Sequence, residues 1–518
     1  MSVTRTTASV ACCERSNGVA PESVSINSSP PQPLQQRSQE HARSGNRGSK
    51  KYRHAFAVHA KNKTSYLSHD AEVAPSFLGF RNLMGLVLVV SNLRLMIENF
   101  RKYGILVTLS GASIRPLDWR WAAFLYFLTP CHLFCAYVIE WLASRAARDV
   151  RAKEKRSEEE EVEETLTEQR KNAVFLTWRV LAVVHAINAT TMLVFATWVV
   201  YYRIHNPGVC VLTQLHSVVV WLKVCSYALT NRDLRDAMLN KDPAKAGLPE
   251  LYKTCPYPSN ITVSNLSYFW WAPTLIYQPV YPKNAERRWD FIFKRVAEFF
   301  LLCVVIWITS AQYAVPLLHN SLNDISRLNL VNVLERVLKL STISLVCWLA
   351  GFFALFQSFL NCLAEIMYFA DREFYGDWWN SSDVRGYWAS WNKPVTNFMK
   401  RHVYAPMVGR GVPPTLAQII TFLFSGFLHE ILIGVPTHNI LGFAFFGMVG
   451  QLPLIFATDP FKKWKGQNGR LIGNLIFWFS FCVFGQPIAA MAYFFAWQAK
   501  YGQQSRPSWP GAWSDVKS

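Results

Sequence analysis

The sequence is poor in charged residues for a chain of its length. Only 17% of its 518 residues are Asp, Glu, Lys or Arg, whereas soluble domains carry about 25%. In their place, 51% of the residues are hydrophobic and 14% are aromatic. This balance excludes an intrinsically disordered protein, a collagen-like repeat and a small disulfide-stabilised domain.

Several common motifs are also missing. The chain has no P-loop, no GxGxxG and no zinc-ligand spacing, and its 11 cysteines include no CxxC pair. An ATP-driven pump is therefore disfavoured. Most cysteines lie inside apolar runs, where they are expected as small core residues. We expect neither a metal ion nor a covalently bound cofactor.

The chain carries a large positive charge. Lys and Arg number 53 against 34 Asp and Glu, which gives +19. In a soluble protein this excess would indicate nucleic acid. Here it lies in the tails and between apolar runs, where basic residues orient membrane proteins or meet anionic headgroups. We therefore expect membrane lipids and no nucleic acid as partners.

Long apolar runs dominate the rest of the chain. A transmembrane helix needs about 20 mainly apolar residues to cross about 30 Å of hydrocarbon. The sequence predicts an all-α polytopic membrane protein with about nine transmembrane helices. They are expected at 83–98, 119–143, 173–201, 208–228, 290–316, 341–369, 414–435, 439–457 and 471–497.

Polar segments divide this membrane region of 76–504. Residues 1–75 are rich in Ser, Pro, Gln and Arg and predict a disordered tail, and 505–518 form a second tail. Basic and then acidic blocks at 145–170 predict a charged linker, either a solvated helix or a flexible loop. Two further loops, at about 230–289 and 371–413, combine Pro, aromatic and polar residues.

An ionisable pair interrupts the run TFLFSGFLHEILIGVP at 421–436, because His429 and Glu430 lie in its middle. Ionisable groups inside a membrane span are unfavourable unless they are paired or functional. One interpretation is a structural His that donates a hydrogen bond to a helix carbonyl, with Glu430 paired to an Arg elsewhere. The other is catalysis, because a neutral imidazole in a dry site can take a proton from a hydroxyl.

Acyl transfer to that hydroxyl would also need donors for the developing oxyanion. Asn392, Gln451 and Gln486 are polar residues in apolar surroundings and are candidates. Their alternative role is hydrogen bonding between membrane helices.

The segment FYGDWWN at 374–380, followed by Trp388, Trp391 and Asn392, is dense in aromatic residues. Such clusters commonly mark the membrane–water boundary, but they can also hold an amphiphile with a polar head. Lys400, Arg401, Tyr404 and Arg410 follow closely and would suit a phosphate-bearing ligand. Orientation by positive charge is the alternative explanation.

These residues resemble those of a known family. FYGDWWN is similar to the FYxDWWN motif of the membrane-bound O-acyltransferases that esterify neutral lipids, and SGFLHE at 425–430 resembles the segment around their active-site His. The resemblance extends from about residue 69 to the C-terminus. WNKPV at 391–395, RHVYAP at 401–406, GQPIA at 485–489, NLRLMIENFRKYG at 92–104 and APTLIYQPVYP at 272–282 resemble the diacylglycerol branch, in a plant or algal form, more than the sterol branch.

The resemblance implies a buried reaction chamber with His429 as the base and Asn392, Glu430, Gln451 and Gln486 as polar lining residues. It implies that fatty acyl-CoA, the co-substrate, is associated with FYxDWWN and with a residue near its head. The corresponding residues are Phe374, Tyr375, Asp377, Trp378, Trp379, Asn380 and Tyr404, and we add Trp391, Lys400, Arg401 and Arg410.

The resemblance further implies triacylglycerol synthesis from diacylglycerol, placement in the endoplasmic reticulum membrane with a cytosolic N-terminal tail, and a homodimer or homotetramer. Two enzyme alternatives are acylation of a sterol and acylation of a long-chain alcohol. Two others are a proton-coupled secondary transporter that uses His429 and Glu430 as a relay, and a lipid-binding scaffold without turnover.

Overall fold

The computed structural model describes residues 78–107, 114–159, 164–239, 248–326, 330–463 and 467–501. The two expected tails, 1–75 and 505–518, lie outside these ranges. Within them the chain is almost entirely helical, and the one β-type contact is an isolated bridge between Lys283 and Phe369. The all-α prediction is therefore confirmed for the described part of the chain.

The first described helix, α2 (Leu78–Tyr103), belongs to a unit of the chain that is separate from the rest. It contains the expected span 83–98, and most of its leucine and valine side chains are exposed. Asn92 and Glu98 interrupt its apolar surface. It is not among the helices that are long and apolar enough to count as a membrane span.

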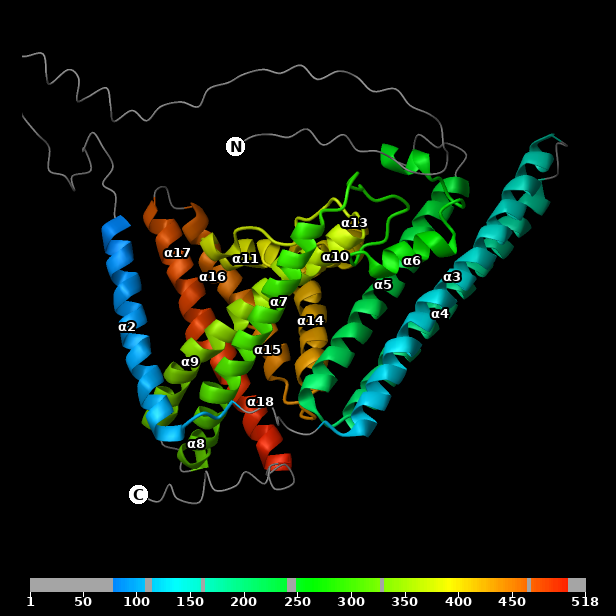
Figure 1. Cartoon of the computed structure of the whole chain (residues 1–518). Helices are drawn as coiled ribbons and strands as arrows, with labels where there is room; N and C mark the ends of the chain where they lie inside the picture. Colours follow the sequence, from blue (N-terminus) through cyan, green and yellow to red (C-terminus); the bar gives the residue numbers. More distant parts are fainter. Residues whose placement is uncertain are drawn as a thin grey trace, which may run out of the picture. The chain divides into compact units, whose positions relative to one another are not determined.

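Three long helices form the N-terminal part of the second unit. They are α3 (Pro116–Glu159), α4 (Glu164–Arg203) and α5 (Pro207–Leu239), and each packs against the other two. The 44 residues of α3 extend over about 66 Å at 1.5 Å per residue, roughly twice the hydrocarbon thickness. α3 and α4 therefore continue past the apolar region into the expected charged linker, and in Figure 1 they project as an antiparallel pair. Of the two forms expected for this linker, the structure shows helix up to Glu159 and from Glu164.

A buried ion cluster joins these three helices. Glu140 on α3 is 1% exposed and accepts a hydrogen bond from Arg235 Nη1 on α5 at 2.8 Å. Its other carboxylate oxygen lies 3.0 Å from His185 Nε2 on α4. A buried carboxylate is tolerated only when it is paired in this way, so the cluster fixes how the three helices meet.

The part of the expected loop 230–289 that follows α5 is described from residue 248 onward. It contains the short helices η2 (Glu250–Thr254) and α6 (Val263–Trp271). The fully buried Lys223 on α5 donates to the carbonyls of Phe269 and Ala272 at 2.7 and 2.8 Å. The helix provides no N–H donor for the carbonyls at its C-terminal end. The lysine supplies this donor and anchors α6 to the bundle.

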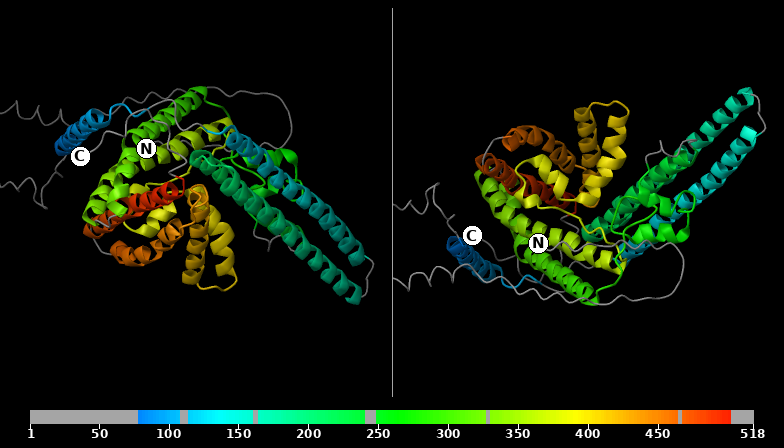
Figure 2. Two further views of the ribbon diagram at one scale, coloured as in Figure 1. Left: turned by 90° about the horizontal axis from the view of Figure 1, so that it is seen from below. Right: turned by 90° about the horizontal axis from the view of Figure 1, so that it is seen from above.

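The C-terminal part of the second unit consists of shorter, broken helices. Their order is α7 (Trp289–Thr309), η3 (Ser310–Ala314), α8 (Val315–Ser326), α9 (Leu330–Phe352), η4 (Phe353–Phe359), α10 (Leu360–Ile366), η5 (Trp378–Asn380), α11 (Val384–Ser390), α12 (Lys393–Phe398), η6 (Met399–Tyr404), α13 (Ala405–Gly409), α14 (Pro414–Ile433), α15 (Phe443–Val449), α16 (Gln451–Lys463), α17 (Gln467–Phe479), η7 (Ser480–Gly485) and α18 (Gln486–Tyr501). The expected loop 371–413 thus contains short helices, and the wider turns η4 and η7 bend two long spans. Figure 2 shows these elements grouped beside the α3–α5 bundle.

Six helical stretches are long and apolar enough to cross a membrane. They are Pro116–Ala152, Thr177–Arg203, Pro207–Leu239, Leu330–Ile366, Pro414–Ile433 and Gly469–Lys500. The chain is therefore a multi-pass membrane protein, but the count of nine is not confirmed. The segment 290–316 is helical but carries four charges in its first half. The segment 439–457 was wrong as a single span, because a left-handed Gly442 (φ 78°) precedes α15 and Gly450 separates it from α16.

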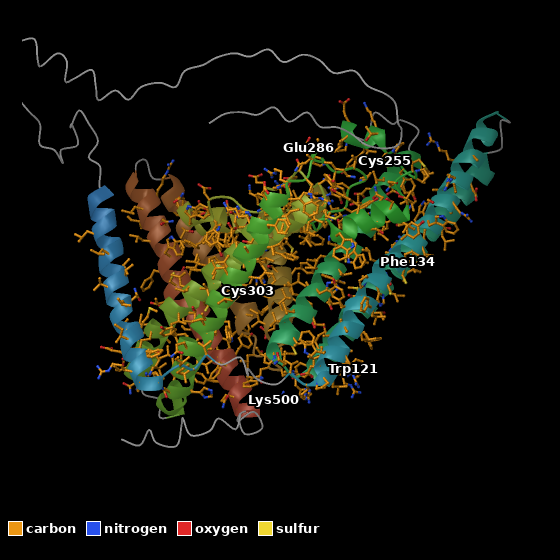
Figure 3. The ribbon with its side chains drawn as sticks, viewed as in Figure 1. Trp121, Phe134, Cys255, Glu286, Cys303 and Lys500 are labelled. Carbon is orange, nitrogen blue, oxygen red and sulfur yellow. The ribbon has the colours of Figure 1, made fainter. Side chains whose placement is uncertain are left out.

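The second unit has two distinct ends. The short helices α6, α10, α11 and α13 gather at one end of the bundle, whereas α8 and the end of α18 lie at the other (Figure 1). The labelled side chains follow the same division, with Cys255 and Glu286 at the first end and Trp121 and Lys500 at the second (Figure 3). The loops with most of the polar and aromatic residues therefore meet on one side.

Candidate active site

The histidine of the apolar run lies in the last third of α14. His429 Nδ1 is 2.7 Å from the carbonyl oxygen of Ser425, one turn earlier. A carbonyl only accepts hydrogen bonds, so Nδ1 carries the proton and the lone pair of the neutral ring is on Nε2. Within the described residues Nε2 has no protein partner. The ring is thus held in the tautomer that a general base requires.

A cavity of about 400 Å³ lies beside this ring. One face of α14 lines the cavity, and its lining residues recur every three or four positions, as expected for one side of a helix. Most of the other lining side chains are apolar, and α5 supplies the opposite wall. The lining residues from α14 are Gln418, Thr421, Phe422, Ser425, Leu428, His429 and Leu432, and those from α5 are Leu215, Val218, Val219 and Leu222.

The structure brings four predicted site residues together in this cavity, namely His429, Asn392, Trp391 and Tyr404. Asn392 begins α12, and its side-chain oxygen accepts from the backbone amide of Val395 at 3.2 Å. This cap fixes the amide group and leaves its nitrogen without a protein acceptor among the described residues. The cavity lining therefore includes a proton acceptor, His429, and a hydrogen-bond donor, the Asn392 amide nitrogen.

A serine also lies near the imidazole, but on its protonated side. Ser425 Oγ is 3.5 Å from His429 Nδ1, the nitrogen that already donates to the Ser425 carbonyl. Because Nδ1 has no free lone pair in this tautomer, it cannot take the proton of the Ser425 hydroxyl. The geometry therefore disfavours a serine nucleophile and an acyl-enzyme.

Glu430 faces a different direction from His429. Its Oε1 accepts from the Gly442 amide at 2.9 Å, and its Oε2 accepts from the Phe445 amide at 3.1 Å. The Tyr493 hydroxyl on α18 donates to the same Oε2 at 2.8 Å and accepts from the Ala444 amide at 3.0 Å. Glu430 and Tyr493 together satisfy the first amides of α15, which a helix leaves unpaired. The structure therefore does not bring the carboxylate to the imidazole.

This cap also positions one wall of the cavity. α15 packs directly against α14, and a Cβ on Gly426 would lie 3.0 Å from the Phe445 ring. Met448, on the last turn of α15, lines the cavity. Tyr493 is a residue that the sequence analysis missed, because nothing in its local sequence indicates a partner 63 positions away.

The two predicted glutamines do not line the cavity. Gln451 accepts from Trp388 Nε1 at 3.4 Å and donates to the Gly447 carbonyl at 3.1 Å, so it supports a lining tryptophan from behind. Gln486 is the first residue of α18 and lies outside the lining set.

The FYGDWWN segment packs behind the cavity. Phe374 and Trp378 are buried, and the Trp378 ring meets Trp348 edge-on at 5.1 Å. Trp348 in turn stacks on the lining residue Trp391 at 5.2 Å. None of the predicted residues Phe374, Tyr375, Asp377, Trp378, Trp379 and Asn380 lines the cavity. In this structure the motif supports the wall and leaves the ligand-facing position to Trp391.

The basic residues that were predicted to bind the ligand do not line the cavity. These residues are Lys400, Arg401 and Arg410, whereas Arg385 does line it. Arg385 Nε and Nη2 donate to the two carboxylate oxygens of Asp459 at 3.2 and 2.7 Å, and Nη1 donates to Gln418 Oε1 at 2.8 Å. The hydrogen bond to Asp459 raises the pKa of Arg385 further. No local feature of the sequence marks this arginine except its position between two aromatic motifs.

His402, near the basic stretch, does not line the cavity either. Its Nε2 lies 2.8 Å from Ser226 Oγ on α5. Burial, with Arg401 as the next contribution, lowers the pKa of His402 to about 4. It is therefore neutral at physiological pH and adds no charge to the ligand region.

Comparisons with known proteins agree with this geometry. Residues 191–495 match the model of the membrane-bound O-acyltransferase family, MBOAT. The chain is 35% identical over 449 residues to diacylglycerol O-acyltransferase 1A of Glycine max, covering 86% of this chain and 82% of the relative. It is 34% identical over 459 residues to diacylglycerol O-acyltransferase 1 of Arabidopsis thaliana, covering 88% and 80%.

The similarity reaches beyond plants. Diacylglycerol O-acyltransferase 1 of Dictyostelium discoideum is 30% identical over 433 residues, covering 83% of this chain and 64% of the relative. The family match contains α5, α11, α12 and α14, the elements that build most of the cavity. The chain is an acyltransferase and belongs to the membrane-bound O-acyltransferase family.

Proposed function

We propose that this acyltransferase makes triacylglycerol from diacylglycerol and fatty acyl-CoA. The observation that carries the proposal is the free Nε2 of His429 beside an apolar cavity that also contains the Asn392 amide. An apolar cavity suits two ligands with long hydrocarbon chains. The names of the relatives support diacylglycerol as the acceptor.

The reaction starts with proton transfer. The free hydroxyl of diacylglycerol gives its proton to His429 Nε2 while its oxygen attacks the thioester carbonyl carbon. An alcohol is a poor nucleophile until this proton leaves, and the Ser425 carbonyl stabilises the imidazolium through Nδ1–H. Diacylglycerol enters sideways from the bilayer, because it barely dissolves in water.

The carbonyl oxygen becomes an oxyanion as the new C–O bond forms. The Asn392 amide nitrogen donates to this oxyanion, and its fixed cap on α12 holds it in place. The intermediate then breaks its C–S bond, and the imidazolium proton passes to the departing coenzyme A sulfur. The base returns to its starting form, and the ester leaves into the membrane.

Product analysis separates this proposal from the alternative acceptor alcohols. The purified full chain would receive radiolabelled oleoyl-CoA with diacylglycerol, cholesterol or hexadecanol, and the products would be separated by thin-layer chromatography. We expect labelled triacylglycerol as the main product. If cholesteryl ester or wax ester is the main product, the acceptor is a sterol or a long-chain alcohol and the proposed reaction mechanism still holds. The absence of any ester would overturn the mechanism.

We also propose that the protein lies in the endoplasmic reticulum membrane as a homodimer or homotetramer with its N-terminal tail in the cytosol. The family resemblance supports these statements. Removing residues 1–68 should then change the oligomer size on gel filtration without abolishing turnover, and an unchanged size would count against the role of the tail.

A further inference from the structure

Arg385 is the cationic side chain that lines the cavity within the described residues, and its setting is unusual. Its side chain is 43% exposed, so the cavity opens to the outside at this point. It lies on α11, at the end of the bundle where α14 begins (Figure 1). Basic residues elsewhere on this side, including Lys400 and Arg410, do not reach the lining.

The Arg385 guanidinium is held in one orientation by side chains from two neighbouring helices. Asp459 on α16 accepts two hydrogen bonds from it, and Gln418 on α14 accepts a third. The start of α11 is fixed as well, because the Val384 amide donates to Thr458 Oγ1 at 3.1 Å. Asp459 is therefore a positioning residue for Arg385.

Donors remain on this fixed group. Arginine has five N–H groups in a planar fork, and three are used by Asp459 and Gln418. The other two have no protein acceptor among the described residues. A fork of this kind with remaining donors is suited to phosphate oxygens.

The distance from this group to the base matches one ligand. Gln418 and His429 are eleven positions apart on α14, a rise of about 16 Å. In coenzyme A, about thirteen bonds separate the pantetheine phosphorus from the sulfur, which is roughly 15 Å when extended at three bonds per residue length. A thioester at His429 would therefore place the phosphate near Arg385.

We infer that Arg385, oriented by Asp459 and Gln418, binds the phosphate of the coenzyme A thioester at the cavity opening. This inference rests on the proposed use of acyl-CoA and names the group that recognises it. The phosphate of an anionic lipid headgroup has the same chemistry and is separated from it by the experiment. A purely structural role for Arg385, as a clasp between α11, α14 and α16, is separated in the same way.

The test compares two thioesters on the full chain in phosphatidylcholine nanodiscs. One is oleoyl-4′-phosphopantetheine, which carries the pantetheine phosphate of coenzyme A, and the other is oleoyl-pantetheine, which lacks only that phosphate. In Arg385→Gln we expect the KM for oleoyl-4′-phosphopantetheine to rise roughly tenfold, the lower end of a hydrogen bond to a charged group, with the KM for oleoyl-pantetheine unchanged. Arg385→Lys keeps the positive charge but lacks the planar fork of donors, so its KM should lie between those of the wild type and Arg385→Gln.

Lys253→Gln is the matched control, because it removes one positive charge from an exposed side chain that does not line the cavity. Its KM for both thioesters should stay at the wild-type value. An equal rise for both thioesters in Arg385→Gln would overturn the assignment in favour of the clasp. No rise for either would overturn it as well.

A second arm adds phosphatidate to the nanodiscs. A defect in Arg385→Gln that appears only with phosphatidate, and equally for both thioesters, would assign the phosphate to a lipid and overturn the inference. Equilibrium binding of free coenzyme A, measured by calorimetry on wild type and Arg385→Gln, repeats the comparison without turnover. The experiments therefore test the proposed phosphate site and the proposed acceptor alcohol separately, and either proposal can fail without the other.

Discussion

The α3–α5 bundle and the α14 region both bury ionisable groups in an apolar setting, but they do so differently. In the bundle, Glu140 is paired with Arg235 and His185. In the α14 region, Glu430 is satisfied by neutral donors, and His429 keeps one nitrogen free beside a cavity. Burial is thus common to both regions, and a free lone pair next to open space distinguishes the site.

The largest expected effect tests the structural side of this comparison. Glu140→Ala leaves Arg235 as an unpaired buried charge, which should destabilise the fold by about 3–5 kcal/mol. The thermal unfolding midpoint of the purified protein in detergent measures this. Glu250→Ala removes an acid from the exposed pair with Lys253 and is the control.

The double variant Glu140→Gln with Arg235→Met sharpens the prediction. Because both charges are gone, it should be more stable than Glu140→Ala. If Glu140→Ala instead unfolds at the wild-type temperature, the ion cluster does not fix the bundle.

Asn392→Asp is expected to have the next largest effect, on turnover. Asp can still cap α12, because its carboxylate accepts from the Val395 amide, but it has no N–H for the oxyanion. Loss of one such donor lowers kcat by about 10²–10³. The assay is initial-rate ester formation, with circular dichroism to confirm the fold. A variant that retains wild-type kcat would remove Asn392 from the mechanism.

Tyr493→Phe should have a smaller effect through the wall of the cavity. It removes one hydrogen-bond donor to Glu430 and the acceptor of the Ala444 amide. Leaving such buried groups unpaired lowers the free energy of unfolding by about 1–3 kcal/mol. We expect a rise in KM for the acceptor with kcat close to wild type, because α15 moves and His429 does not.

Adding Glu430→Gln to this variant should raise the KM for the acceptor further, because the amide of either Gly442 or Phe445 then faces an NH2 group and loses its acceptor. Loss of kcat alone would indicate a chemical role for Glu430.

The sequence analysis succeeded where the signal was local. Apolar length predicted the six helices that are long and apolar enough to cross a membrane, and the polar interruption of one of them pointed to His429, which the structure places beside the cavity. Neighbouring helix positions differ by about 100°. Leu428 and His429 lie toward opposite edges of the lining face on α14, so Glu430, the next position around the helix, points away from the cavity.

Other features depended on contacts between distant segments. Tyr493 and Arg385 gain their roles from partners 63 and 74 positions away, and no local pattern reports such a pairing. The FYGDWWN segment looked like a ligand surface because it combines aromatic and polar groups, but its rings pack on Trp348 and Phe352. The break at Gly450 was missed because the apolar run continues through it.

The central claim is that His429 acts as a base through its free nitrogen. The most direct measurement is kcat of His429→Ala in the triacylglycerol assay, beside His319→Ala, whose imidazole lies on α8 away from the cavity lining. General-base catalysis contributes about 10²–10⁴, so His429→Ala should lose at least two orders of magnitude at normal protein level while His319→Ala stays near wild type. Turnover of His429→Ala close to wild type would contradict the account.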